Sequence, residues 1–250
     1  MKPLDLDRVC DYVNDTIVDF HQRRINSLER LTLARLLKKN PYLFRAKHII
    51  TAGHLMESLL DAFLSSSEEK LFGDFLEGLA IYVAQETCNG HKSASQGIDL
   101  EFISRGTHFL VSIKSGTNWG NSSQHAKLAQ DLSNGVIRVR QSRTQMNVQA
   151  VLGICYGKTK TTYQKSGYLK VVGQNFWYLI SDNRDLYTDI IEPIGYRARE
   201  HNKAFDGERA RVTNRFTQEF IVAFCDEQGN IDWPRLVEFN SGNYDLDDVL

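Results

Sequence analysis

The apolar residues in the first third of the chain recur at helical spacing. Val9, Val13 and Ile17, for example, lie four residues apart and would share one face of a helix. Ser66 and Glu69 have the spacing of a capping box, which indicates the start of another helix. The helices predicted from these patterns span residues 4–37 with a break near residues 23–26, residues 43–64, and residues 66–86.

From Gly97 onward the helical period changes to alternation. The stretch GIDLEFISRGTHFLVSIKSG has apolar residues at every second position on both sides of Arg105-Gly106. It predicts an antiparallel hairpin with a two-residue turn. QAVLGICYG and GYLKVVG are short apolar runs bounded by glycine and predict two buried strands, whereas NFWYLIS fits either a strand or the start of a helix. The pattern is helical again over residues 185–224.

The order of these elements predicts the fold class. Helices precede the strands, one helix follows the hairpin, and further helices come after the last strand. This order is typical of an α/β fold with a mixed sheet covered by helices on both faces. Three regions are predicted along the chain: a helical region over residues 1–64, a core over residues 65–240, and an acidic tail over residues 241–250.

Composition narrows the class of protein. The 250 residues are 42% hydrophobic and 24% charged, which is the profile of a soluble globular protein with one substantial core. No uncharged apolar run approaches ~18 residues, and the first residues lack the layout of a secretory signal, so we expect a cytoplasmic protein. The four cysteines have no metal-ligand spacing, so we expect reduced thiols and neither a zinc site nor a disulfide framework.

The basic residues are distributed unevenly along the chain. The formal net charge is only -1, but residues 132–181 contain no Asp or Glu. The basic residues of this span are Arg138, Arg140, Arg143, Lys158, Lys160, Lys165 and Lys170. An exclusively basic span predicts a local anion-binding surface.

The polar face of the predicted hairpin combines acids with a lysine. Because side chains alternate across a strand, Asp99 and Glu101 share one face, and a two-residue turn places Asp99 opposite Ser112. Lys114 lies diagonally across and points into the same space. A carboxylate binds Mg²⁺, the lysine can position water or neutralise a phosphate, and the carbonyl of Ile113 can add an oxygen ligand. These parts suit metal-assisted phosphodiester hydrolysis, although a solvated hairpin face with a cross-strand salt bridge would use the same residues.

An acidic residue on one strand, followed after a turn by a (D/E)xK pattern, resembles the PD-(D/E)XK nuclease superfamily. The segments EEKLFGDFLEGLA, GIDLEF, VSIKSG, NWGNSSQ and NFWYLIS together resemble type II restriction endonucleases of the PmeII-type family, from about Asn40 onward. The resemblance implies a restriction-endonuclease-like core and Mg²⁺ as the cofactor. It also implies that Asp99 is a metal ligand and Lys114 the catalytic lysine.

The sequence departs from this pattern at Ser112, which stands where the second carboxylate is expected. Glu77 ranks first among three acids that could replace it, because it lies in the helix before the hairpin on a side flanked by small residues such as Gly73. A helix glutamate before the first catalytic strand also recurs in similar nucleases. Glu101 ranks second, since it shares the hairpin face but lies closer to the turn, and Asp131 on the following helix ranks third. The predicted metal ligands are Asp99, Glu77 and the carbonyl of Ile113.

The resemblance makes double-stranded DNA the expected partner. Lys and Arg side chains and helix N-termini, such as the one predicted near residues 121–122, contact phosphates, while Arg, Asn and Gln can read base edges. The candidate DNA-binding residues are Lys92, Asn118, Ser122, Gln124, Arg138, Arg140, Arg143, Lys158 and Lys160. Residues 1–64 add further basic side chains and are expected to grip DNA or to form the interface of a homodimer.

Three functions are open at this point. The first is a Mg²⁺-dependent type II restriction endonuclease that cuts double-stranded DNA at a short, palindromic sequence. The second is a structure-specific or repair nuclease of the same superfamily, similar to a junction resolvase. The third is a non-catalytic DNA-binding protein on a degenerate nuclease fold, a possibility that Ser112 raises.

Overall fold

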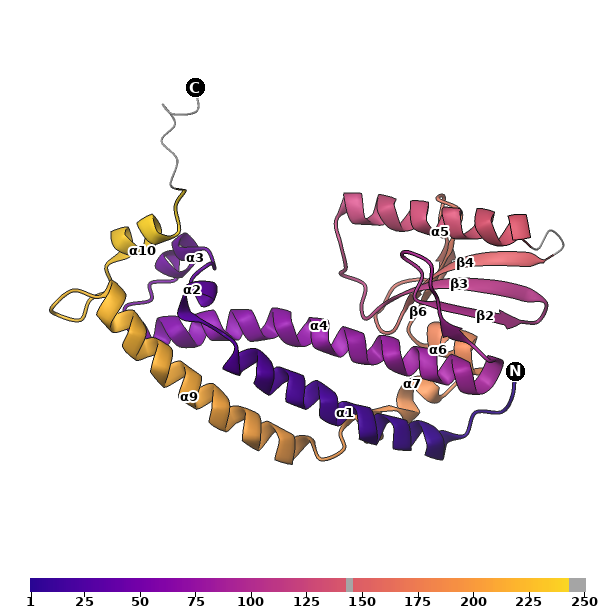
Figure 1. The fold of residues 1–250 in the computed structure, drawn as a ribbon, viewed down its shortest axis with the longest axis horizontal. Helices are drawn as coiled ribbons and strands as arrows, with labels where there is room; N and C mark the ends of the chain where they lie inside the picture. Colours follow the sequence, from indigo (N-terminus) through magenta and orange to yellow (C-terminus); the bar gives the residue numbers. More distant parts are fainter. Residues whose placement is uncertain (143–145, 243–250) are drawn as a thin grey trace, which may run out of the picture. The chain divides into compact units, whose positions relative to one another are not determined.

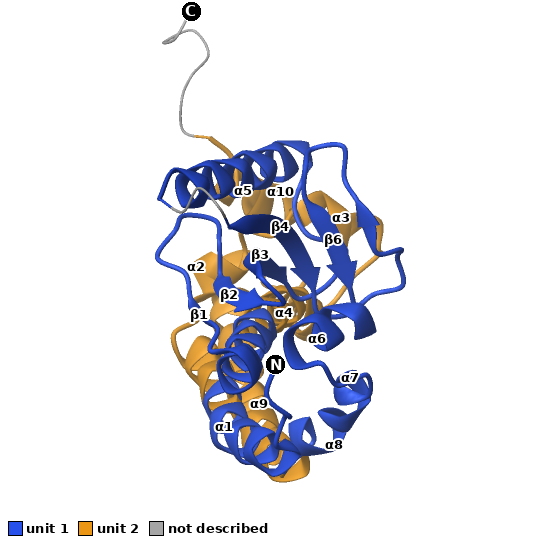
Figure 2. Cartoon of the chain, turned by 90° about the vertical axis from the view of Figure 1, so that its right-hand side faces the viewer, with its two compact units in different colours: residues 1–20, 72–196 blue, residues 21–71, 197–250 orange. Residues whose placement is uncertain are grey.

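The chain folds into two compact units, and neither is continuous in sequence. The computed structural model (Figure 1) describes residues 1–142 and 146–242. The first unit, called the sheet unit here, consists of Met1–Phe20 and Phe72–Tyr196 (Figure 2). The second, called the helical unit, consists of His21–Leu71 and the described part of Arg197–Leu250. Most of the predicted acidic tail lies outside the described residues.

One of the three boundaries between the units lies between Tyr196 and Arg197, and the other two fall inside two long helices. These are α1 (Leu6–Glu29) and α4 (Ala52–Cys88). The region predicted over residues 1–64 is therefore divided between the two units, and its predicted end lies in the middle of α4.

The sheet unit contains a six-stranded mixed sheet, as the pattern of apolar residues predicts. Its strands are β1 (His91–Lys92), β2 (Leu100–Ser104), β3 (Thr107–Lys114), β4 (Asn147–Ile154), β5 (Thr162–Tyr163) and β6 (Leu169–Val172). They lie in the order β1-β2-β3-β4-β6-β5. The three inner strands β3, β4 and β6 are parallel, and the other pairings are antiparallel.

The hairpin of β2 and β3 has the predicted register. Ser104 pairs with Thr107, so the turn consists of Arg105 and Gly106 alone. Both turn residues have positive φ, 50° and 74°, which is the conformation that a tight two-residue hairpin turn requires. Asp99 lies just before β2, and its backbone N–H donates to the carbonyl of Val111 at 2.8 Å. This bond extends the ladder by one residue and brings Asp99 opposite Ser112, near the end of β3.

Helices cover both faces of this sheet (Figure 1). Helix α5 (Ser122–Ser142) packs on one face, where Leu128 and Leu132 meet Leu110 and Leu152. The other face packs against α1, α4 and α6 (Gln174–Ser181). The short helices α7 (Leu186–Asp189) and α8 (Ile191–Ile194) complete the unit. NFWYLIS therefore forms a helix, α6, and not a strand.

One residue of the hairpin lies on a different face from the predicted one. Alternation places Ile98 beside Leu100 and Phe102, but Ile98 packs with Leu110 and Leu128 on the side of α5. The reason is that β2 begins only at Leu100, and the backbone at Gly97 has a φ of 73°, so strand alternation does not extend back to Ile98.

The long helices also differ from the prediction. Helix α1 continues to Glu29 without a break near residues 23–26, and α4 runs through Ser66 without starting there. The Ser66 hydroxyl donates back to the carbonyl of Ala62 inside the helix and does not cap a first turn. Burial explains this continuity, because apolar residues of α4 pack into the cores of both units and outweigh the local capping signal.

In the described residues, the regular structure of the helical unit consists of helices and one isolated β-bridge between Cys225 and Ile231. Besides its parts of α1 and α4 it contains α2 (Leu33–Leu36), α3 (Pro41–Ala46), α9 (Ala198–Phe224) and α10 (Trp233–Phe239). The helix predicted over residues 43–64 is thus interrupted between α3 and α4. Its core gathers large side chains such as Leu59, Phe216 and Phe220. In the described part of the chain, no helix combines the length and the apolar character that crossing a membrane demands.

Candidate active site

Asp99 occupies the end of the hairpin and is held by β3. Its Oδ2 accepts a hydrogen bond of 2.6 Å from the backbone N–H of Ile113 and one of 3.3 Å from the hydroxyl of Ser112. The pairing of β2 with β3 ends at Leu100, and beyond it the backbone N–H of Ile113 donates to the Asp99 side chain. A backbone donor therefore orients the carboxylate. Ser112 is only 1% exposed and touches Asp99 directly. It supports the first acid and brings no second charge.

Lys114 points to the same side of the hairpin as Asp99. Its Nζ lies 4.0 Å from Asp99 Oδ2 and donates to the carbonyl of Ile113 at 2.9 Å. The ammonium also lies 5.6 Å from the centre of the Trp119 ring. The predicted convergence of a carboxylate and a lysine on one face is therefore present, with both side chains about a quarter to a third exposed and open to a ligand.

Glu77 reaches this group of residues from α4. One turn earlier in the helix, a Cβ atom placed on Gly73 would lie 3.6 Å from the hydroxyl of Ser115, an ordinary van der Waals distance, so α4 lies close to the residue that follows β3. Burial and then the charge of Asp99 raise the pKa of Glu77, while Lys92 and Lys114 lower it to a smaller extent. Glu77 Oε1 also pairs with Lys92 Nζ at 3.4 Å. Two carboxylates thus repel each other across this site.

The other two candidate acids are engaged elsewhere. Glu101 accepts a hydrogen bond from the hydroxyl of Ser93 and lies 3.1 Å from His108 Nε2, so both of its carboxylate oxygens have partners. Asp131 packs against the backbone of Gly97 and pairs with Lys127 on its own helix at 3.7 Å. Glu77 is the candidate acid whose pKa responds to the charges of Asp99 and Lys114.

The donor set fits a hard divalent cation. Mg²⁺ binds oxygen ligands and is commonly held by one or two carboxylates together with water and substrate phosphate. Glu77, Asp99 and the carbonyl of Ile113 supply such oxygens, and the mutual repulsion of the two acids is what a cation would relieve. Among the described residues no group of three or more His, Cys, Asp or Glu side chains could hold a metal. A cation here would accordingly need the carbonyl and its substrate as well.

The loop after Lys114 leads into α5 through a well-formed cap. The Asn121 side chain accepts from the backbone N–H of Gln124, and the Gln124 side chain accepts from the N–H of Asn121, at 3.1 and 2.8 Å. Gln124 therefore has a structural partner, while Asn118 and Ser122 are exposed. Sequence reasoning missed Trp119, whose ring lies between Lys114 and the ring of His125. An aromatic residue five positions after the lysine was the available signal.

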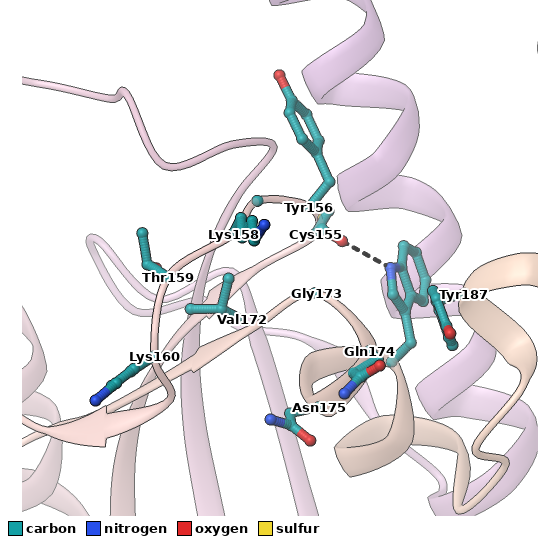
Figure 3. A pocket seen from close by; sticks show the side chains of 12 residues that line it. Cys155, Tyr156, Lys158, Thr159, Lys160, Val172, Gly173, Gln174, Asn175 and Tyr187 are labelled. Carbon is teal, nitrogen blue, oxygen red and sulfur yellow. Dashed lines mark hydrogen bonds between the residues drawn. The ribbon is translucent and has the colours of Figure 1, made fainter.

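The basic residues among the predicted DNA-binding residues lie in three places within the described part of the chain. Arg138 and Arg140 are exposed on α5. Lys158 and Lys160 lie in the loop after β4, where they line a pocket of about 530 Å³ (Figure 3). Lys92 is exposed on β1 and adjoins the candidate active site through Glu77. Arg143 lies outside the described residues.

The sheet order, the helices on both faces and the acid and lysine at the end of β3 define a restriction-endonuclease fold. The family model of type II restriction endonuclease EcoO109I matches residues 7–202, and the chain belongs to this family. The family is one of endodeoxyribonucleases, so the substrate is DNA. No curated protein matches the chain. The match is to the EcoO109I family, and the PmeII-type resemblance and the PD-(D/E)XK assignment stay predictions.

Proposed function

We propose that the protein is a Mg²⁺-dependent nuclease of the PD-(D/E)XK type that cuts both strands of DNA at a short, palindromic sequence. The observation that supports this proposal is the convergence of Glu77, Asp99 and Lys114 at the end of β3 in a chain of a restriction endonuclease family. A palindromic site matches a protein with two-fold symmetry, so we further propose a homodimer acting in the cytoplasm.

Each residue of the site has a distinct task in this proposal. Glu77, Asp99 and the Ile113 carbonyl would hold the cation, which when bound supplies positive charge to the scissile phosphate and lowers the pKa of water. The N–H of Ile113 and the hydroxyl of Ser112 fix the Asp99 carboxylate in place. Lys114 carries an ammonium donor beside Asp99, where it can hold a water molecule or a phosphate oxygen.

Cleavage of plasmid DNA tests the proposal directly. Wild-type protein, Asp99→Asn and Lys114→Ala would be incubated with plasmid and Mg²⁺, and the products would be separated on a gel and their ends sequenced. We expect discrete fragments with a common end sequence from the wild type. Both variants should cut roughly a thousandfold more slowly or worse, since each removes a charge that acts on the reacting phosphate. Both should keep binding DNA in a gel shift without Mg²⁺.

The same experiment separates the alternatives. Nicking that depends on branched or looped DNA, with no common end sequence, would support a structure-specific nuclease. Sequence-independent or specific binding by the wild type without any cleavage would indicate that Ser112 marks a degenerate, non-catalytic site. Cleavage that persists in Asp99→Asn and Lys114→Ala would place the active site elsewhere and contradict the proposal.

A further inference from the structure

A polar pocket lies next to the candidate active site in the sheet unit. It has a volume of about 530 Å³ and is formed at the ends of the parallel strands β4 and β6 and at the start of α6 (Figure 3). The pocket wall formed by Cys155 and Tyr156 is hydrogen-bonded to the segment that carries Lys114. The N–H of Cys155 donates to the carbonyl of Lys114 at 2.9 Å, and the N–H of Tyr156 donates to the carbonyl of Ser115 at 3.0 Å.

The chemistry of the pocket favours an anionic polymer over a small apolar ligand. Lys158 and Lys160 contribute two positive charges, and no Asp or Glu occurs among the described residues that line the pocket. A backbone phosphate adjacent to the scissile one would meet these lysines, because the pocket wall continues from β3 through backbone hydrogen bonds. The pocket therefore adjoins the candidate active site and has the charge that suits a DNA backbone.

Two amide side chains at the start of α6, those of Asn175 and Gln174, differ in their hydrogen bonds. The Asn175 amide donates to the hydroxyl of Thr161 at 3.1 Å, and this hydroxyl also accepts from the backbone N–H of Val172. Asn175 therefore ties the loop after β4 to the start of α6. The Gln174 amide is exposed in the pocket and makes no hydrogen bond to any other described residue (Figure 3). Its donor and its acceptor are both available to a ligand.

We infer that Gln174 is a specificity-determining residue that reads one base edge of the recognised DNA sequence, while Lys158 and Lys160 hold the flanking phosphates. A primary amide offers a donor and an acceptor side by side and pairs with the matching edge of a base, most often adenine. The lysines contribute affinity without sequence information, because every nucleotide carries the same phosphate. This inference rests on the proposed function, since it assigns part of the same DNA-binding surface.

The test compares base preference and affinity in four proteins. Wild type, Gln174→Ala, the double variant Lys158→Ala/Lys160→Ala, and Gln218→Ala as a matched exposed glutamine on α9 would each select from a library of randomised duplexes. Selection would be performed twice, once by binding without Mg²⁺ and once by cleavage with Mg²⁺. The salt dependence of binding to one fixed duplex would be measured in parallel.

We expect Gln174→Ala to lose preference at one base pair of the wild-type sequence, by roughly tenfold, and to keep it at the others. The lysine variant should keep the whole preference, bind more weakly, and lose roughly two units from the slope of log affinity against log salt. Gln218→Ala should match the wild type in both.

The outcomes separate this inference from the proposed function. Specific wild-type cleavage combined with an unchanged preference in Gln174→Ala would overturn the inference alone. Specific binding that Gln174→Ala relaxes, without cleavage by any variant, would overturn the nuclease proposal and support the inference. A wild type that neither selects nor cuts any duplex would overturn both.

Discussion

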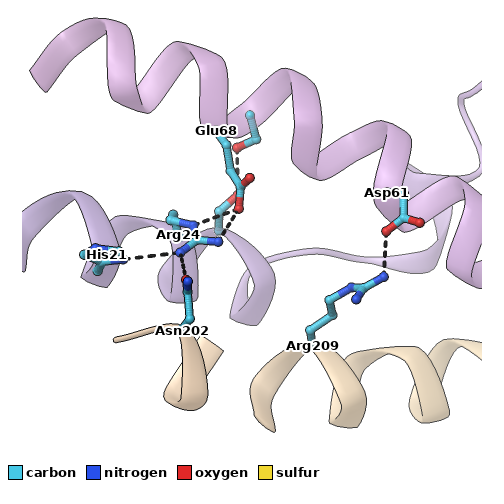
Figure 4. Close-up of polar contacts among 8 residues, drawn as sticks. His21, Arg24, Asp61, Glu68, Asn202 and Arg209 are labelled. Atoms are coloured by element: carbon cyan, nitrogen blue, oxygen red, sulfur yellow. Dashed lines mark hydrogen bonds and ion pairs between the residues drawn. The ribbon is translucent and has the colours of Figure 1, made fainter. Parts of the chain in front are cut away.

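The two units of the molecule each contain a cluster of charged side chains, and the clusters differ in how the charges are balanced. In the helical unit, the Nε and one terminal nitrogen of Arg24 both lie 2.7 Å from Glu68 Oε1, and its other terminal nitrogen donates to Asn202 at 2.9 Å (Figure 4). The guanidinium also lies 3.9 Å from the centre of the Phe205 ring. The Arg24 side chain is only 11% exposed, and its charge is paired with Glu68.

In the sheet unit, by contrast, like charges face each other. Glu77 and Asp99 repel, which together with burial raises the pKa of Glu77, and Lys114 is 4.0 Å from Asp99. A folded protein gains nothing in stability from such an arrangement. The partly buried Arg24–Glu68 pair therefore indicates a role in packing, while two partly exposed acids that repel each other beside Lys92 and Lys114 suit a site that takes a ligand.

Substitution of single glutamates by glutamine would give the largest effect that tests this contrast. We expect Glu77→Gln to slow cleavage roughly ten-thousandfold, which corresponds to about 5.5 kcal/mol, because a metal ligand and its charge are lost. Glu101→Gln, whose carboxylate is bound to Ser93 and His108, should slow it less than tenfold. Single-turnover rates at saturating Mg²⁺ measure both. Equal losses in the two variants would show that Glu77 holds no special position.

The sequence predicts the hairpin of this site well because its determinants are local. Alternation and a turn of Arg105 and Gly106 determine the register, and the register alone brings Asp99 and Lys114 to one face. The cap at Asn121 is predictable for the same reason, since both of its hydrogen bonds join residues three positions apart.

The sequence ranks Glu77 first among the three acids, but it does not place their side chains. Glu101 shares the hairpin face, but its side chain turns to His108, and nothing in a strand pattern reports a side-chain rotamer. Glu77 depends on where α4 lies against the end of β3, which is a tertiary contact at Gly73 and Ser115. The unbroken course of α4 through Ser66 likewise follows from burial in two cores and overrides a local capping signal.

Substitution of Arg24 in the helical unit should lower the stability of the protein and should not slow DNA cleavage. Arg24→Leu leaves Glu68 partly buried without its cation, and we expect a loss of about 4 kcal/mol in the free energy of unfolding. Arg209→Leu is the matched control, because Arg209 and its partner Asp61 are 38% and 63% exposed, and it should cost less than about 1 kcal/mol. Urea unfolding measures both. A similar small loss in the two variants would contradict the packing role of Arg24.

His21 makes the helical unit sensitive to acid. Its ring stacks on His201 at 4.4 Å and lies 3.3 Å from the Arg24 guanidinium. Burial, His201 and Arg24 lower the pKa of His21 from 6.5 to about 4. The unfolded chain therefore binds a proton more readily than the folded one, so stability is lost as the pH falls from 6.5 toward 4.

The expected loss over this pH range is about 3 kcal/mol, because one pKa unit corresponds to roughly 1.4 kcal/mol. Unfolding free energies measured at several pH values should show it in the wild type. His21→Phe keeps an aromatic ring against His201 and removes the titrating group, so its stability should depend less on pH between 6.5 and 4. An unchanged slope in this variant would assign the acid sensitivity to other groups.

Substitution of Trp119 tests how far the catalytic role proposed for Lys114 depends on this aromatic neighbour. The Lys114 ammonium lies 5.6 Å from the ring centre, a contact that attracts a cation by roughly 1 kcal/mol. We expect Trp119→Leu to lower kcat roughly tenfold with little change in KM, because Trp119 positions the lysine and does not bind the substrate. Trp119→Phe should recover most of the rate. A rise in KM with kcat unchanged would indicate that Trp119 contacts DNA.

The smallest expected effect has the opposite sign and concerns Glu77 without a metal. Because the folded protein raises the pKa of Glu77, its ionised form destabilises the fold, and this cost grows as the pH rises from the ordinary glutamate pKa to the raised one. Glu77→Gln should therefore be more stable than the wild type at neutral pH, by less than about 1 kcal/mol, with no gain at a pH below the ordinary glutamate pKa.

Mg²⁺ supplies the control for this last prediction. A cation that binds only the folded wild type stabilises it in proportion to its occupancy, so the advantage of Glu77→Gln should shrink or reverse as Mg²⁺ is added. Thermal unfolding with and without Mg²⁺ at pH 7 measures the difference. If Glu77→Gln were less stable than the wild type in the absence of metal, Glu77 would be a balanced charge like Glu68 in the helical unit, and the contrast between the two clusters would not hold.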